Sequence, residues 1–117
     1  MKERPYTAME YMDNTYDQMR ATAYHEFGHQ VHQLYGTNRF SRGTSTEQFL
    51  SYRRPPVEER LKKVDISGGP SEYSQENERE WFAENFAMWA MRREDLVDPQ
   101  FTVIIDDLLK GAKDGKN

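Results

Sequence analysis

Three histidines and a glutamate fall within the nine residues YHEFGHQVH, residues 24–32, and these are all the histidines of the chain. The segment from His25 to His29 matches the pattern H-E-x-x-H. Residues four apart lie on one face of an α-helix, about 6 Å apart along its axis, so two imidazoles can reach one metal ion. The stretch therefore predicts a helix whose histidine face meets a second element that completes a metal site.

Two residues inside the motif carry further expectations. Glu26 directly follows the first candidate ligand. From there its carboxylate reaches a metal-bound water more easily than it reaches the ion itself. A general base must lie beside that water. Gly28 costs roughly 1 kcal/mol of helix propensity relative to alanine, which predicts a close approach of another element. A polar helix that carries histidines by chance is the alternative, and a third ligand would decide between the two.

The third ligand is expected outside this helix. His32 lies about 10 Å further along the axis than His25, so we predict that it is a surface residue or supports a ligand. NEREWFAENF, residues 77–86, places Glu80 and Glu84 four apart on one helix face. One carboxylate could bind the metal while the other holds a histidine by its far nitrogen. A solvated acidic stripe is the alternative, although the apolar neighbours of Glu84 make an idle charge there expensive.

The chain as a whole is predicted to be mainly α, with at most a small sheet, so that the H-E-x-x-H helix packs against the glutamate-bearing helix. Caps and apolar spacing predict helices at residues 14–35, 45–53, 55–64, 75–93 and 98–111. The last segment contains a β-branched run, but its apolar spacing favours a helix over a strand. We predict one domain over residues 1–110 and a flexible tail over 111–117.

Composition narrows the possible partners. The net charge of −4 argues against nucleic-acid binding through phosphate contacts, and the absence of cysteine excludes disulfides and thiolate metal sites. No apolar stretch approaches membrane-spanning length, and residues 1–13 lack the apolar region of a signal peptide. We therefore expect no membrane partner and, by default, a cytoplasmic or phage-associated location; a place within a larger protein stays open.

Two segments together resemble a known family. HEFGH, followed from residue 71 by SEYSQENEREWFAENFAMW, resembles the catalytic domain of anthrax lethal factor and its relatives, which are zinc peptidases of the gluzincin type. The match covers about residues 24–30 and 71–88. The two segments also resemble peptidase-like domains appended to phage head-morphogenesis proteins. In the lethal factor family a strand beside the active-site helix binds extended substrate; either residues 1–13 form it here or the chain lacks it.

The resemblance implies a role for each residue that matches the family's motifs. It implies that Zn²⁺ is the cofactor and that its ligands are His25, His29 and Glu80. It also implies that Glu26 is the general base, that Tyr73 of SEYS stabilises the oxyanion, and that Glu84 is the carboxylate that supports a ligand.

We therefore predict a zinc metallopeptidase that hydrolyses a peptide or protein substrate, with Glu26 as the general base. The alternative is a non-catalytic binding or assembly module that keeps a metal for stability, such as a domain of a phage structural protein. A toxin-like effector with the same chemistry is a third possibility. An enzyme needs a coordination position open to water and a cleft beside it, whereas a structural site is closed by protein.

Overall fold

The computed structural model describes residues 4–36 and 63–114. They form the α-helices α1 (Thr15–Gly36), α4 (Glu78–Ala90) and α5 (Pro99–Asp114) and the short 3-10 helices η1 (Ala8–Tyr11), η3 (Ile66–Gly68), η4 (Tyr73–Gln75) and η5 (Glu94–Leu96), with no strand in either range. The predicted mainly α fold is confirmed. No helix in these two ranges combines the length and the apolar character needed to cross a membrane.

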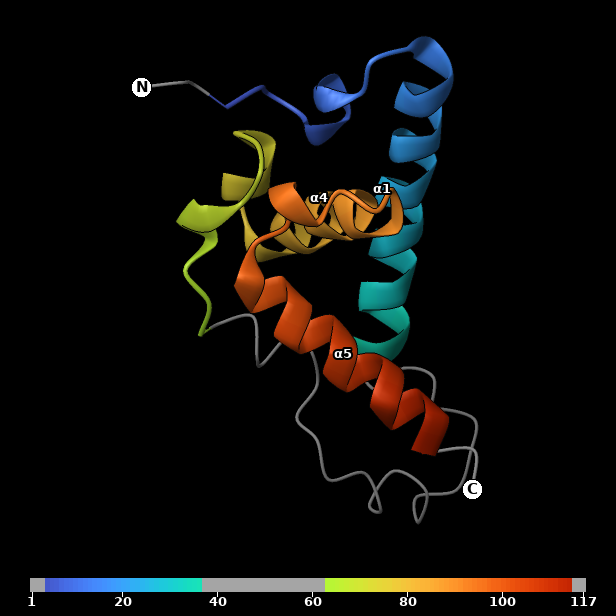
Figure 1. The fold of residues 1–117 in the computed structure, drawn as a ribbon. Helices are drawn as coiled ribbons and strands as arrows, with labels where there is room; N and C mark the ends of the chain where they lie inside the picture. The colour runs from blue at the N-terminus through green and yellow to red at the C-terminus, as the bar shows by residue number, and fades with distance from the viewer. Residues whose placement is uncertain (1–3, 37–62, 115–117) are drawn as a thin grey trace.

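Helix α1 carries the H-E-x-x-H motif and begins where its cap predicts. The Asn14 side chain accepts a hydrogen bond from the Asp17 amide at 2.8 Å, which satisfies a free N–H of the first turn. Figure 1 shows α4 running across α1. The predicted close approach at Gly28 is confirmed, because a Cβ atom there would lie 2.9 Å from Cβ of Phe86 on α4. Glycine thus lets the two helices meet at the level of the motif.

Helix α4 is shorter than the predicted segment of residues 75–93. It starts late because the Asn77 side chain caps it, accepting from the Glu80 amide at 2.9 Å. It ends early because Arg92 adopts a left-handed conformation with φ of 63°. The Arg93 amide then donates to the Met88 carbonyl at 2.9 Å and the Arg92 amide to the Trp89 carbonyl at 3.1 Å. This is a Schellman motif with arginine at the position that usually holds glycine.

The core surrounds α4. One cluster of buried residues joins α4 to α5 and comprises Trp81, Phe82, Phe86, Phe101, Ile104 and Ile105. A second cluster joins α4 to η1 and the start of α1 and comprises Ala8, Met12, Ala21, Ala87 and Met88. The prediction that the apolar spacing of residues 98–111 makes a helix is confirmed by α5, which continues to Asp114, beyond the predicted start of the tail.

The remaining predictions concern the segment between α1 and α4. The helix predicted at residues 45–53 lies outside the described residues, as does most of the one at 55–64, whose last two residues, Lys63 and Val64, lie in a turn. The turns predicted for residues 65–74 are present as η3 and the start of η4. These turns place Ser71 beside Glu84 of α4 and Tyr73 beside His25 of α1.

Candidate metal centre

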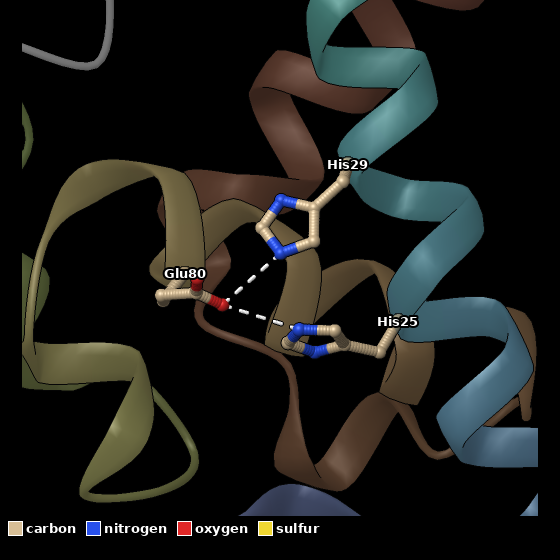
Figure 2. A group of neighbouring side chains, drawn as sticks. All are labelled: His25, His29 and Glu80. Carbon is tan, nitrogen blue, oxygen red and sulfur yellow. Dashed lines mark hydrogen bonds and ion pairs between the residues drawn. The ribbon is translucent and has the colours of Figure 1, made fainter.

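Two histidines of α1 and one glutamate of α4 converge on one point. Figure 2 shows Nε2 of His25 and Nε2 of His29 both directed at the same carboxylate oxygen of Glu80, Oε1, each at 3.1 Å. One ligand atom from each of the three residues lies within 4.8 Å of the others. The structure therefore brings together the two histidines of the motif and the glutamate named as the third ligand, which the sequence separates by 51 residues.

The donor set suits a zinc ion. Two atoms that each lie about 2.0–2.1 Å from a tetrahedral ion are themselves about 3.3 Å apart, and the imidazole–carboxylate distances of 3.1 Å are close to that separation. Two imidazoles and a carboxylate are also a known ligand set of catalytic zinc. Two of the three pairs of ligand atoms thus have about the separation expected around Zn²⁺, and all three atoms lie within 4.8 Å of one another.

Glu84 contacts Nδ1 of His25, the ring nitrogen that does not face Glu80. Its Oε2 atom lies 2.8 Å from Nδ1 of His25, and the residue is only 3% exposed. The alternative of a solvated acidic stripe is therefore wrong for Glu84. Because a neutral imidazole that donates from Nδ1 has its lone pair on Nε2, this hydrogen bond leaves Nε2 free to bind a metal.

In the metal-free chain His25 is surrounded by carboxylates. Burial alone would lower its pKa, but the hydrogen bond and charge of Glu84 outweigh burial, the charges of Glu80 and Glu26 add to this effect, and the pKa of His25 is raised. When the ring is protonated, its Nε2–H points at Glu80. A metal ion bound here would replace that proton.

Tyr73 and Glu26 lie beside the three candidate ligands. The Tyr73 ring stacks on the His25 ring, with centroids 5.8 Å apart and planes inclined by 17°. Burial, followed by the charge of Glu80 and a hydrogen bond to it, raises the pKa of Tyr73, so its phenol keeps its proton and can donate it in a hydrogen bond. Glu26 is exposed and borders the same pocket as Tyr73 and His25.

This pocket has a volume of about 290 Å³. Its walls come from η1 and its cap, from one face of α1, from α4 and from Tyr73. The lining residues are Thr7, Met9, Ala21, Thr22, His25, Glu26, Tyr73, Glu84 and Ala87. A small molecule or a side chain can therefore enter a space that is bordered by Glu26, Tyr73 and the candidate ligand His25.

Of the two positions expected for His32, on the surface or in support of a ligand, the first is wrong. His32 is 5% exposed, and its ring centroid lies 5.4 Å from that of Phe82 in the core. It is also not part of the group formed by the three candidate ligands. The extra turn of helix beyond His29 carries His32 away from the metal centre and into the α1–α4 contact.

Two groups at the site were not foreseen. The Ser71 hydroxyl and the Ala8 backbone N–H both donate to Oε1 of Glu84, at 2.5 and 2.7 Å. Ser71 stands two residues before Tyr73, which is a weak signal in the sequence. No residue type marks a backbone N–H, so nothing in the sequence identifies Ala8.

Comparison with protein-family models, with curated proteins and with solved structures gives no match for this chain. Its function is therefore argued from the geometry of the site and from the motif-level resemblance of residues 24–30 and 71–88.

Proposed function

We propose that this chain is a zinc-dependent peptidase of the gluzincin type, in which Glu26 is the general base. One observation carries the proposal: Nε2 of His25 and Nε2 of His29 meet the same Glu80 oxygen at 3.1 Å, beside a pocket bordered by Glu26 and Tyr73. The resemblance of both segments to the lethal factor family supports it.

The residues of the site have separate roles in the proposed hydrolysis. Zn²⁺, when bound by His25, His29 and Glu80, supplies a positive charge that acidifies a water and polarises a carbonyl. Glu26 takes a proton from the attacking water as a new C–O bond forms at the peptide carbonyl. It then gives the proton to the amine as the C–N bond breaks. Because Glu26 is exposed on the pocket, it can meet both water and substrate.

Tyr73 is suited to stabilise the charge that develops on the carbonyl oxygen. Its raised pKa keeps the phenol protonated, and its ring is held against His25. Its hydrogen bond to Glu80 puts the phenol beside the candidate ligands, from where it can donate to a charge that develops next to the ion. Two neutral imidazoles, one carboxylate and Zn²⁺ carry a net charge of about +1, which favours an anionic intermediate.

The test is a pair of substitutions combined with metal analysis and a peptide-library cleavage assay. Glu26→Gln should keep its zinc and lose about 10²- to 10⁴-fold in turnover, because it lacks only the base. His25→Ala should lose both zinc and turnover. A chelator should abolish turnover of the native chain, and added zinc should restore it. Glu94→Gln makes the same chemical change at an exposed residue of η5 and should behave like the native protein.

Two results would contradict the proposal. Retained turnover in Glu26→Gln would remove Glu26 from the role of base. Stoichiometric zinc binding without cleavage of any peptide in the library would favour the alternative, a metal-stabilised binding or assembly module.

A further inference from the structure

Glu84 accepts hydrogen bonds from three distant parts of the chain. Its Oε2 atom faces Nδ1 of His25 at 2.8 Å, while its Oε1 atom accepts from the Ser71 hydroxyl at 2.5 Å and from the Ala8 N–H at 2.7 Å. The carboxylate is buried, and an isolated charge there would be costly. The three donors offset the cost of burying this charge and fix the orientation of the carboxylate.

The two donors to Oε1 belong to segments that are tied together. The Pro5 carbonyl accepts from the Glu72 amide at 2.9 Å, and the Tyr6 carbonyl accepts from the Tyr73 amide at 2.8 Å. Further along, the Tyr11 hydroxyl donates to the Pro70 carbonyl at 2.8 Å. We call residues 5–12 the N-terminal segment. It is bonded to both sides of Ser71, so the Ala8 N–H and the Ser71 hydroxyl reach Glu84 as one unit.

We propose that Ser71 and the backbone N–H of Ala8 are positioning groups that set the metal affinity of His25 by fixing Glu84. Glu84 can orient the imidazole only if the carboxylate is itself held, and Oε1 is held by these two donors. With Glu84 in place, Nδ1 of His25 carries the hydrogen and Nε2 presents its lone pair toward Glu80 and His29. This inference rests on the proposed function only in taking His25 as a metal ligand.

The first test is Ser71→Ala, which removes one donor to Oε1 and also the acceptor of the Ser74 amide in the turn, at 3.1 Å. Loss of groups that support a ligand typically costs 10- to 100-fold in metal affinity, and for a residue that acts through Glu84 we expect about tenfold. Zinc affinity is measured by competition with a chelator. Two further readouts are the absorption spectrum of the Co²⁺-loaded protein, which reports ligand geometry, and the ¹⁵N shifts of His25 in the metal-free protein at a pH where the ring is neutral, which report its tautomer.

Ser74→Ala is the matched control. Ser74 is buried in the same turn and exchanges hydrogen bonds with the backbone of Ser71, at 3.2 Å from the Ser71 amide and 2.6 Å to its carbonyl. Its removal therefore disturbs the turn but leaves the Ser71 hydroxyl on Glu84. We expect Ser74→Ala to keep the native zinc affinity, Co²⁺ spectrum and His25 tautomer.

A second variant tests the other donor independently. Ala8→Pro removes the N–H at the first position of η1, where proline is tolerated, and Thr7 before it has the extended conformation that a residue preceding proline requires. The proline ring also occupies the place from which the N–H donates, so Glu84 must move. Ala8→Gly keeps the N–H and is the control for loss of the methyl group.

The outcomes separate this inference from the proposed function. A weaker zinc affinity with an altered Co²⁺ spectrum and a mixed His25 tautomer in both Ser71→Ala and Ala8→Pro, but not in the controls, supports the inference. Native values in either variant, or equal losses in Ser71→Ala and Ser74→Ala, overturn it. These measurements use no peptide, so a failure to find any cleaved substrate would contradict the proposed function and leave this result standing.

Discussion

Helix α4 is buried on two sides by different means. Toward α5 it presents Trp81 and Phe82, which pack on Phe101. The polar contacts on this side run to Asp98, whose side chain accepts from Trp81 Nε1 and whose amide donates to the Asn85 side chain. Toward α1 and the N-terminal segment, α4 adds two carboxylates to an apolar cluster: Glu80 and Glu84, which are held by hydrogen bonds and ion pairs. Apolar packing depends on area and volume, whereas hydrogen bonds depend on single atoms. We therefore expect changes on the α5 side to alter stability and changes on the α1 side to alter the site.

The largest effect on stability is expected from Phe101→Ala on the α5 side. Phe101 is 0% exposed, and its ring centroid lies 5.1 Å from that of Phe82. Truncation of a buried phenylalanine typically costs about 3–5 kcal/mol, a large part of the free energy of unfolding of a small domain. Denaturant unfolding of the metal-free protein measures this cost, and the fraction that stays folded should bind zinc with native affinity.

Val103→Ala is the control on the same helix. Val103 is 63% exposed, so its truncation should change the free energy of unfolding by less than about 0.5 kcal/mol. Equal effects of the two substitutions would show that α5 does not pack on α4 as described. A loss of zinc affinity in folded Phe101→Ala would show that the two sides of α4 are coupled.

An intermediate effect is expected from Gly28→Ala at the crossing of α1 and α4. It should appear both in the free energy of unfolding and in the zinc affinity. Alanine gains about 1 kcal/mol of helix propensity, but its Cβ atom would lie 2.9 Å from Phe86 Cβ and 3.2 Å from Ala83 Cα. Since neither atom is the end of a flexible side chain, the helices must separate, and overpacking of this kind costs about 1–3 kcal/mol. We expect a net destabilisation of about 0–2 kcal/mol.

The same separation should weaken the metal site, because His25 and His29 flank Gly28 on α1 while Glu80 is on α4. Denaturant unfolding and zinc competition measure the two effects on one variant. Gln30→Ala places an alanine at an exposed position of the same helix and should leave both values unchanged. A Gly28→Ala variant that is more stable than the native chain would contradict the close contact.

Much of the helical fold could be predicted from the sequence, because its signals are local. Asn14 caps the first helix, and the apolar spacing of α5 outweighs its β-branched run. The end of α4 could not be predicted in the same way. Arg92 takes the left-handed conformation that glycine usually supplies, so the residue that terminates the helix looks like one that continues it.

Whether a residue of the site could be predicted from the sequence depends on the kind of group that it contributes. The spacing of His25 and His29 on one helix is visible in the sequence, and a carboxylate among apolar neighbours marks Glu84. His32 was misjudged because helical spacing gives its face but not what packs on that face. The Ala8 N–H could not be found at all, since every residue except proline carries one and only the folded chain shows which of them reaches Glu84.

The smallest effect is expected from Asp95→Asn, which lies outside both sides of α4. Asp95 pairs with Arg93 at 3.1 Å on the surface, and this hydrogen bond lowers the pKa of Asp95 from its ordinary value of 3.8. A lowered pKa favours the folded state above pH 3.8, and this contribution is lost as the pH falls through the folded value. Because solvent screens the exposed pair, we expect native zinc affinity and near-native stability at neutral pH, and only a slightly flatter acid unfolding curve. A clear loss of stability at neutral pH, measured by denaturant unfolding, would instead assign the turn after α4 a structural role comparable to that of the core.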